Sequence, residues 1–324
     1  MEDIIDIKYD GAGERLDKFL SDKFFRFSRE DIKRAIIAGK ITVNKETKKP
    51  SYKLSADDQI DGKIGFVKTV SEPTGEKIKL DIIFEDDDVA VINKPAGMVV
   101  HPGENNEAGT LVNALIEKYP KISLAVPERG DDSIKVQRPG IVHRLDKDTT
   151  GTIIIAKTKD SYDFLSKKFK ERKVTKIYMA LCFGWPKEDR GEISNFLARH
   201  NSDRKRMSEV DEDRGKLAIS KYKVIETYKD NSGDKYSLIE FDIKTGRTHQ
   251  IRVHAKSLGI PVLGDKKYYT KFSKLASDKL KTKRQLLHAK ELTIQIPSDS
   301  KSRTFKVEIP KDFQSTIDSL IIVK

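Results

Sequence analysis

Cysteine is almost absent from this sequence. Cys182 is the single cysteine among 324 residues, which excludes an internal disulfide and a cysteine-rich metal site. Long hydrophobic runs are missing as well, because no apolar stretch approaches the roughly 20 residues that a membrane helix needs. The acidic start, MEDIIDIKYD, lacks the apolar core of a signal peptide. These absences favour a cytoplasmic protein that has no membrane partner.

Three common catalytic signatures are absent or incomplete. The stretch GTIIIAKT at residues 151–158 imitates a phosphate-binding P-loop, but Ala156 replaces the second glycine and three isoleucines favour a strand. No G-x-S-x-G nucleophile elbow occurs. There is no HExxH pair, and the spacing of His249 and His254 would place them on different faces of a helix. We therefore expect neither a nucleotide cofactor nor a metal.

Positive charge, by contrast, is in excess. The chain has 63 Lys and Arg against 51 Asp and Glu, a formal net charge of +12 and a pI near 9.4. Such a balance favours a polyanionic partner, either nucleic acid or an acidic membrane surface, although lysine also serves solubility. The segments 199–206 and 266–284 are basic, and aromatic residues are interleaved in the second. Each is either a solvated loop or a surface for nucleic acid.

The N-terminal part reads as a small separate unit over residues 13–62. Leu16, Phe19 and Leu20 recur at helical spacing, a second amphipathic helix follows, and KITVN alternates like a short strand. Residues 63–78 are polar and include a proline and a glycine, which is typical of a linker. We predict an N-terminal domain over residues 1–75.

From residue 79 onward the sequence is rich in strand patterns. The predicted strands are LDIIFE, VAVINK, GTIIIAKT, TKIYMALCF, KYKVIETY, YSLIEFDIK and ELTIQI. Two segments, DSYDFLSKKFKERK and RTHQIRVHAKSLG, are predicted helices. Because strands outnumber helices and short turns join several of them, we predict an α+β domain over residues 79–324 with a mostly antiparallel mixed sheet.

Three segments combine turn residues with charged side chains. They are INKPAGMVVHPG (92–103), GIVHRLDKDTTG (140–151) and KTGRTHQIRVHA (244–255). In the second, Asp146 lies in a polar turn close to an arginine. Such a carboxylate either stabilises its loop through an ion pair or Asx-turn, or is held ionised for nucleophilic or acid–base chemistry. The spacing alone leaves both readings open.

These segments resemble the ribosomal large-subunit pseudouridine synthases of the RluA/RluD type. HRLDKDTTG is a specific match, and INKPAGMVVHPG with GTLVNAL, KIYMAL, TGRTHQIRVH with GIPVLGD, and LHAKEL are similar to further family motifs, spread over residues 91–296. Residues 13–62 resemble the small alpha-L RNA-binding domain, with helices and a β-hairpin, first named in a small-subunit ribosomal protein. The stretch LAVPERGDDSIKVQ before Arg138 is longer than expected for the family, and we interpret it as a lengthened surface loop.

The resemblance implies an isomerase that converts uridine to pseudouridine in RNA without a cofactor. It makes Asp146 the nucleophile, which either attacks the ribose anomeric carbon or assists formation of a glycal. It makes Arg252 the partner that favours the ionised carboxylate, with Arg247 as runner-up and otherwise a phosphate contact. Tyr178 is expected to stack on the uracil and to take part in proton transfer, whereas the pattern alone would make it a core tyrosine.

The resemblance also implies how RNA is bound. The target base must leave its stack, and Arg144 is expected to fill the vacated space, while His143 shapes the loop or, alternatively, acts in the chemistry. In the N-terminal domain, the basic residues expected to contact RNA are Arg15, Arg29, Lys33 and Arg34. The expected substrate is large-subunit ribosomal RNA, with transfer RNA as the alternative, and the expected state is a monomer. The rival functions are a non-catalytic RNA-binding factor and an RNA hydrolase using His143 and Asp146.

Overall fold

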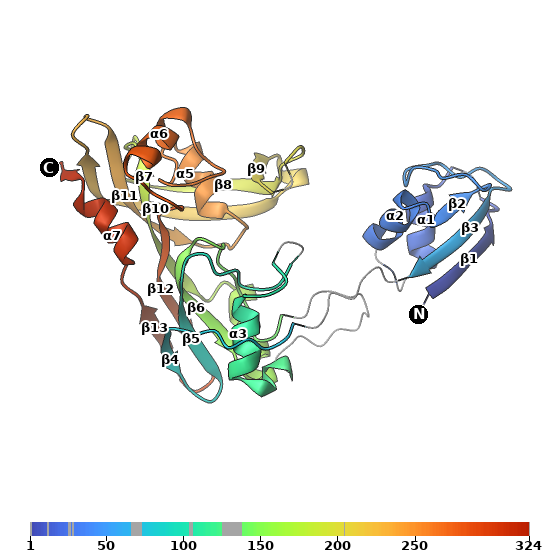
Figure 1. The fold of residues 1–324 in the computed structure, drawn as a ribbon, viewed down its shortest axis with the longest axis horizontal. Coiled ribbons are helices and arrows are strands. Elements are labelled where there is room, and N and C mark those ends of the chain that lie inside the picture. The colour runs from blue at the N-terminus through green and yellow to red at the C-terminus, as the bar shows by residue number, and fades with distance from the viewer. Residues whose placement is uncertain are drawn as a thin grey trace. The chain divides into compact units, whose positions relative to one another are not determined.

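The computed structural model describes residues 2–11, 13–24, 27, 29–65, 73–103, 106–124, 138–203 and 205–323. The described chain forms two compact units, residues 2–65 and residues 73–323 (Figure 1). Most of the long stretch before Arg138 that we interpreted as a surface loop lies outside the described residues. No helix in the described part of the chain combines the length and the apolar character needed to cross a bilayer.

The N-terminal unit packs two helices on a three-stranded antiparallel sheet. The strands follow the order β1 (Glu2–Lys8), β3 (Gln59–Gly65), β2 (Ile41–Val43). The helices are α1 (Leu16–Lys23) and α2 (Arg29–Ile37). Leucine and isoleucine side chains at helical and alternating spacing form a closed core, including Leu16, Leu20, Ile32, Ile36, Ile41, Ile60 and Ile64. The predicted helices and strand are confirmed, and β1 and β3 complete the sheet.

The linker predicted over residues 63–78 is wrong at both ends. Strand β3 continues to Gly65. At the other end, the side-chain amide of Asn113 donates to the Thr74 carbonyl at 2.8 Å, and the backbone N–H of Gly109 donates to Glu76 at 3.0 Å. These hydrogen bonds tie the segment to the larger unit, because a polar composition does not prevent a segment from docking through its backbone.

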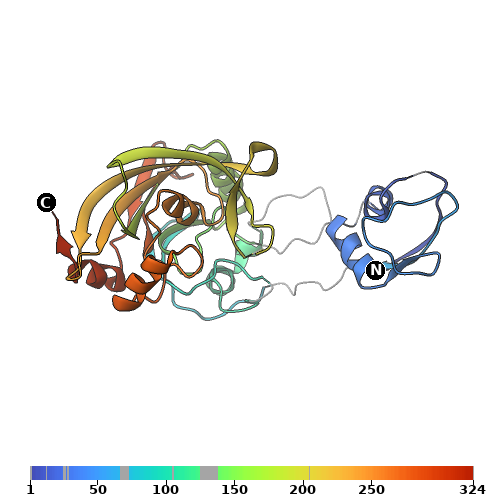
Figure 2. The same cartoon turned by 90° about the horizontal axis from the view of Figure 1, so that it is seen from above.

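The larger unit is built on an 11-stranded mixed sheet (Figures 1 and 2). Its main order is β4 (Ile82–Glu85), β5 (Val89–Lys94), β6 (Thr150–Ala156), β12 (Leu287–Gln295), β7 (Thr175–Phe183), β11 (Lys235–Ile243), β10 (Lys216–Lys229), β8 (Arg190–Arg199), β9 (Met207–Val210). Strand β13 (Ser302–Lys306) pairs with β12, and β14 (Ile321–Ile322) with β10. Among the described strands only β6 and β12 pair parallel, so the predicted mostly antiparallel sheet is confirmed.

The parallel pairing of β6 and β12 depends on a glycine. Gly151 has a φ of +109°, and a Cβ atom there would lie 2.2 Å from the carbonyl oxygen of Ala289 on β12. Only glycine allows this backbone conformation and this close approach. All seven residues of β6 are buried, as expected for a strand covered on both faces. GTIIIAKT is therefore a central strand, as its isoleucines predicted.

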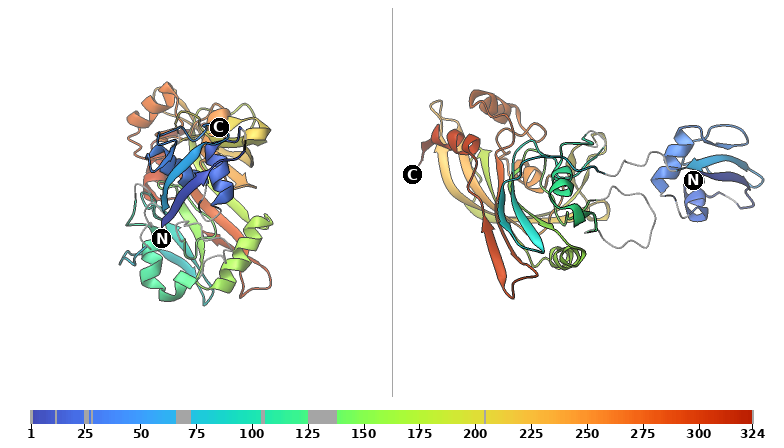
Figure 3. Two further views of the ribbon diagram at one scale, coloured as in Figure 1. Left: turned by 90° about the vertical axis from the view of Figure 1, so that its right-hand side faces the viewer. Right: turned by 60° about the horizontal axis from the view of Figure 1, so that its bottom comes forward.

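Helices cover both faces of the sheet (Figure 3). On β6, Ile153 and Ile155 pack with α3 (Leu111–Lys118) and α5 (Gln250–Ser257). Ile154 points the other way, into the cluster that contains Leu165 of α4 (Lys159–Lys170). On this second face, α7 (Lys311–Asp318) adds Phe313, and α6 (Lys271–Lys279) adds Ala276. Helix α4 was predicted from the sequence, whereas α3 and α6 were not. Each of the three begins with a threonine capping box.

Candidate active site

The loop that contains the sequence HRLD (residues 143–149, the HRLD loop) leads into β6, and two buried cations hold it in place. The ammonium of Lys94 is fully buried and donates to the Lys147 carbonyl at 2.9 Å, as well as to two carbonyls in residues 95–98. The guanidinium of Arg284 donates to the carbonyl of Asp148 at 3.1 Å. Because both cations donate to backbone carbonyls, the side chains of the loop remain available for other contacts.

The carboxylate of Asp146 meets Arg252, which reaches it from α5. Nη1 of Arg252 donates to Oδ2 of Asp146 at 3.0 Å, and the two side chains are 5% and 18% exposed. Arg252 also donates through Nε and Nη2 to Asp265, at 2.6 Å and 2.8 Å. The structure therefore brings together the pair expected from the sequence, and it adds a second carboxylate behind the arginine.

Arg247 is not the partner of Asp146, because it lies in the turn before α5. The predicted helix began at Arg247, whereas α5 begins at Gln250. The side-chain oxygen of Gln250 accepts from the Arg247 backbone N–H at 3.0 Å and from the Thr245 hydroxyl at 2.7 Å. Nε of Arg247 donates to the Leu217 carbonyl at 3.0 Å. The Gln250 side chain thus holds the preceding residues in a turn, so the helix begins at Gln250 and not at Arg247.

Tyr178 lies in the middle of β7 and is 8% exposed. Its ring belongs to the core cluster on the α5 side of the sheet, and it also lines the cavity that contains Asp146. Burial, assisted by the charge of Asp146, raises the pKa of Tyr178 above its ordinary value of 10. The hydroxyl therefore keeps its proton, which suits donation more than action as a base.

Two neighbouring hollows, which share several lining residues, surround these side chains. The smaller has a volume of about 70 Å³ and is lined by Asp146, Arg252 and His249 among others. The larger has a volume of about 460 Å³. Arg144, Tyr178 and Arg247 line both. A group bound in the larger cavity would therefore lie next to the carboxylate.

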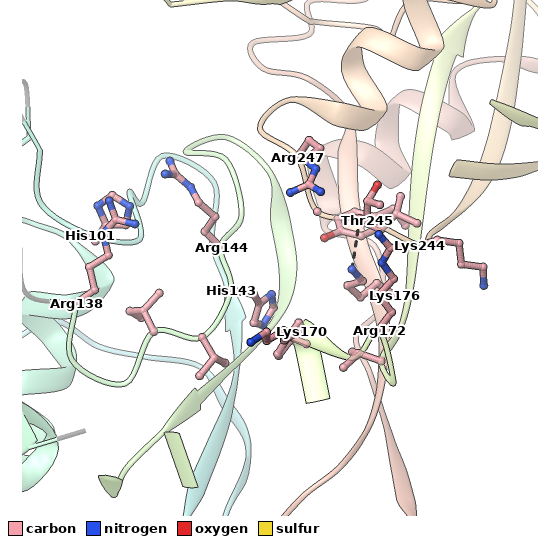
Figure 4. A pocket seen from close by; sticks show the side chains of 17 residues that line it. His101, Arg138, His143, Arg144, Lys170, Arg172, Lys176, Lys244, Thr245 and Arg247 are labelled. Atoms are coloured by element: carbon pink, nitrogen blue, oxygen red, sulfur yellow. Dashed lines mark hydrogen bonds between the residues drawn. The ribbon is translucent and has the colours of Figure 1, made fainter. Parts of the chain in front are cut away.

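The larger cavity is lined by positive charge. Its described lining contains seven lysine or arginine side chains and no aspartate or glutamate: Arg138, Arg144, Lys170, Arg172, Lys176, Lys244 and Arg247. Figure 4 shows Arg138 and Arg144 on one side, and Lys176, Lys244 and Arg247 on the other. Burial lowers the pKa of Lys176 to about 8, and its ammonium donates to the Thr245 carbonyl at 3.4 Å. Grouped cations of this kind favour an anionic ligand.

His143 is used within the fold. Its Nε2 accepts from the Ile154 backbone N–H at 3.0 Å, and its ring stacks on Phe169 with centroids 4.7 Å apart. Burial lowers its pKa to about 3, so the imidazole is neutral at neutral pH. These contacts match the loop-shaping role and leave no lone pair for a hydrolytic base.

Several residues around the carboxylate were not singled out from the sequence. Asp265 lies in the quoted segment GIPVLGD, His249 was considered only as a metal ligand, and Tyr268 only as an aromatic in a basic loop. All three line or support the Asp146 site. Within the described chain, no group of three His, Cys, Asp or Glu side chains could hold a metal ion.

The basic residues expected to bind RNA in the N-terminal unit are all ion-paired. Arg15 and Arg29 both contact the buried Asp17, at 2.9 Å and 3.1 Å. On α2, Lys33 pairs with Glu30 and Arg34 with Asp31. The four side chains keep 34–56% of their surface exposed. Surface ion pairs are weak, so these cations can still exchange partners.

A carboxylate–guanidinium pair beside a cavity lined by cations fits a protein that acts on a polyanion. The chain belongs to the RNA pseudouridylate synthase family, whose model matches residues 88–257, and an S4 domain model matches residues 14–60. It is therefore an isomerase that acts on RNA, and the family resemblance read from its motifs is confirmed.

Similar proteins cover nearly the whole chain. An uncharacterised RNA pseudouridine synthase of Aquifex aeolicus is 40% identical, over 97% of this chain and 96% of that protein. Ribosomal large subunit pseudouridine synthase D is 37% identical in Zymomonas mobilis, over 96% and 95%, and 34% identical in Haemophilus influenzae, over 97% and 94%. Among solved structures, human RNA pseudouridylate synthase domain containing 1 matches with a TM-score of 0.58 and 27% identity, over 77% of this chain and 91% of that one.

Proposed function

We propose that this protein converts uridines of large-subunit ribosomal RNA to pseudouridine, with Asp146 as the nucleophile and without a cofactor. The observation that carries the proposal is the position of the Asp146 carboxylate, held by Arg252 at 3.0 Å next to a cavity lined by cations. The names of the relatives from Zymomonas and Haemophilus support the ribosomal target.

The reaction balances without an added reagent. The bond from N1 of uracil to C1′ of the ribose breaks, a bond from C5 to C1′ forms, and the proton on C5 is replaced by one on N1. Nothing is oxidised or reduced overall. Asp146 either attacks C1′ to give a covalent intermediate, or removes the 2′ hydrogen to give a glycal.

Arg252 and Tyr178 complete the proposed chemical group. Arg252 orients the Asp146 carboxylate and pairs with its charge, so that neither buried group is left without a partner. Tyr178 is neutral because burial raises its pKa, so it acts as a hydrogen-bond donor and proton carrier while its ring packs against the uracil. Both residues are almost completely buried, at 4% and 8% exposure, which limits the contact of Arg252 and Tyr178 with bulk water.

RNA binding is assigned to the cations around the site. Arg144 is exposed and lines both hollows, where it can fill the space that the flipped nucleotide leaves in the RNA. Arg247, Lys176 and Lys244 line the larger cavity and would contact phosphates of the same strand. In the N-terminal unit, the residues assigned to RNA are Arg15, Arg29, Lys33 and Arg34.

The first test replaces the nucleophile. Asp146→Asn preserves size but removes charge, so release of tritium from RNA labelled at C5 of uridine should fall by roughly 10⁴-fold or more. The matched control is Asp163→Asn, an exposed aspartate of α4, which should leave turnover unchanged. RNA affinity and the melting temperature should stay near those of the wild type. Substantial turnover by Asp146→Asn would overturn the assignment.

The second test concerns the substrate. Wild-type protein is incubated with unmodified large-subunit RNA, small-subunit RNA and transfer RNA, and pseudouridines are mapped in each. We expect discrete sites in large-subunit RNA and unchanged RNA length, since isomerisation releases no fragment. Modification confined to transfer RNA would refute the ribosomal target, and cleavage would favour the hydrolase. Turnover should persist after exhaustive dialysis against a chelator.

A further inference from the structure

The segment Asp265–Tyr268 lies behind Arg252 and sets the plane of its guanidinium. Asp265 has no exposed side-chain surface and accepts from both Nε and Nη2 of Arg252, in the parallel two-bond arrangement that fixes orientation. This leaves Nη1 as the atom that reaches Asp146, at 3.0 Å. The direction of Arg252 is therefore decided by the second carboxylate.

Asp265 is itself held firmly. Its Oδ1 accepts from the backbone N–H groups of Lys267 at 2.8 Å and Tyr268 at 3.0 Å. Burial opposes ionisation of Asp265, but the hydrogen bonds from Arg252 and the backbone outweigh it and lower its pKa. The preceding residue, Gly264, has a φ of +77°, and a Cβ atom there would lie 1.9 Å from the Arg284 carbonyl. The backbone can therefore adopt this path only with glycine at that position.

The arrangement leaves one oxygen of the nucleophile open. Arg252 donates a hydrogen bond to Oδ2 of Asp146, and Nε2 of His249 lies 3.9 Å from the same oxygen. Within the described chain, Oδ1 has no hydrogen-bond donor. An arginine not restrained elsewhere commonly binds both oxygens of a carboxylate. Occupying two of its N–H groups on Asp265 prevents that.

His249 faces the same oxygen and carries its proton on a defined nitrogen. The Tyr268 hydroxyl is buried, accepts from the Met207 backbone N–H at 2.6 Å and lies 2.8 Å from Nδ1 of His249. If His249 donated there, the tyrosine proton would have no acceptor among the described residues. Buried polar groups are paired, so Tyr268 donates to Nδ1, and the imidazole proton is on Nε2, on the side of Asp146.

The backbone of His249 supports a functional position. Its φ of 57° and ψ of 16° lie in the left-handed region, at the N-cap of α5. A side chain there is strained and is kept when the surrounding structure requires it. Burial lowers the pKa of His249 to about 4, so the ring stays neutral and has one donor to offer.

We propose that the Asp265–Tyr268 segment positions the catalytic group: Asp265 restricts Arg252 to one oxygen of Asp146, and Tyr268 fixes His249 as a neutral Nε2–H donor to a substrate oxygen. The proposal rests on Asp146 being the nucleophile. Asp265 and Tyr268 are positioning residues, whereas His249 touches the substrate. Oδ1 of Asp146 is then the oxygen that reacts.

The first experiment needs no turnover. Long-range proton–nitrogen NMR spectra of the full chain with ¹⁵N-labelled histidine report the tautomer of each imidazole, and His249→Asn assigns the signal by its loss. We expect His249 to be protonated on Nε2 at pH 7, and Tyr268→Phe to give a mixture of tautomers. Tyr236→Phe, which removes another buried hydroxyl bonded to Asp230, is the control and should leave the signal unchanged. Protonation on Nδ1 in the wild type would overturn the assignment.

The second experiment measures tritium release by Asp265→Asn. The amide has only one acceptor, so Arg252 is released toward both oxygens of Asp146. We expect kcat to fall by roughly 10–100-fold with KM nearly unchanged, because the geometry of the bound state is lost while binding is kept. Asp230→Asn, a buried carboxylate bonded to Lys279 and Tyr236, is the matched control and should keep kcat. All variants are compared at equal folded fraction.

The outcomes separate this proposal from the proposed function. If Asp146→Asn turns over RNA, the nucleophile itself is wrong, whatever Asp265→Asn does. If Asp146→Asn is inactive and a folded Asp265→Asn keeps the wild-type kcat, the positioning role is wrong and the nucleophile stands. If Asp265→Asn does not fold, Asp265→Glu takes its place, because it keeps both acceptor oxygens but displaces them; a wild-type kcat in folded Asp265→Glu would likewise overturn the positioning role.

Discussion

Tyr178 lies both in the core and at the candidate site, two positions that the sequence analysis treated as alternatives. It packs in the core of the sheet, and it also lines the Asp146 cavity. A buried phenol beside a carboxylate keeps its proton, since both burial and the negative charge raise its pKa. At neutral pH it therefore stays protonated, so the proton transfer that we propose for Tyr178 begins with donation.

Removing this hydroxyl tests its part in the chemistry. Tyr178→Phe keeps the ring and the packing, so RNA affinity and melting temperature should change little. Turnover should fall by roughly 10²–10⁴-fold, the usual contribution of a positioned acid or base. Single-turnover tritium release and equilibrium RNA binding are the measurements. Equal losses of rate and affinity would instead assign the hydroxyl to binding.

At the scale of elements, the HRLD loop depends on cations that the fold buries. Lys94, at the end of β5, is fully buried, and burial lowers its pKa to about 7 despite the attraction of Asp148 and Asp146. Its three backbone acceptors, at 2.8 Å, 2.9 Å and 2.9 Å, join the loop after β5 to the loop before β6. The lysine thus connects two motifs that are far apart in the sequence.

Replacing Lys94 should loosen the loop. Lys94→Met fills a similar volume but leaves buried carbonyls without a donor, so we expect a loss of roughly 1–3 kcal/mol in unfolding free energy. Urea unfolding measures the loss, with Lys79→Met, an exposed lysine, as the control. Turnover of the folded variant should fall too, because the loop carries Asp146, the proposed nucleophile. An unchanged unfolding free energy would show that water or a shifted backbone replaces the ammonium.

For the whole molecule, buried neutral histidines couple stability to pH. Burial lowers the pKa of His143 to about 3, and of His101, His249 and His254 to about 4. Unfolded histidine titrates near 6.5, so between about pH 6.5 and 4 the unfolded chain binds more protons than the folded one. Stability must then rise with pH across this window and fall as pH drops.

Urea unfolding at several pH values between 7.5 and 4.5 tests this linkage. The free energy of unfolding should decrease on acidification, and the slope should be smaller in His143→Gln, whose side-chain oxygen can still accept from the Ile154 N–H. Stability that is flat or increases toward pH 4.5 would contradict the burial of neutral imidazoles. A variant with an unchanged slope would remove His143 from the set.

The two units can be tested separately, because their hydrophobic cores have no member in common among the described residues. Deleting residues 1–72 should leave a folded larger unit that modifies short RNA with nearly wild-type kcat. On large-subunit RNA, KM should increase and site choice should become less selective, since linked binding modules raise effective concentration. Pseudouridine mapping with both proteins is the measurement. Identical sites and rates would give the S4 domain another purpose, and a folded but inert truncation would make it part of the catalytic unit.

Local patterns were sufficient wherever a few neighbouring residues decide the structure. Strand β7 runs from Thr175 to Phe183, as its β-branched and aromatic run predicted, and the isoleucines of β6 correctly outweighed its likeness to a P-loop. Strand β8 was not predicted, because RGEISNFLAR has few apolar residues and only one buried position. The start of α5 was placed too early because the Gln250 cap and the left-handed His249 follow from contacts with β10.

By itself, the sequence determined the family, the α+β class, and the identity of Asp146, Tyr178 and Arg252 as candidates. Only the tertiary structure decided that Arg252 contacts one oxygen of Asp146, although 106 residues separate them, and that Asp265 stands behind it. Propensity and periodicity act over a few residues along the chain, whereas these contacts depend on how β6, β12, β7 and α5 pack. The side that a guanidinium presents and the nitrogen that carries a proton are set by those neighbours, and no linear motif encodes them.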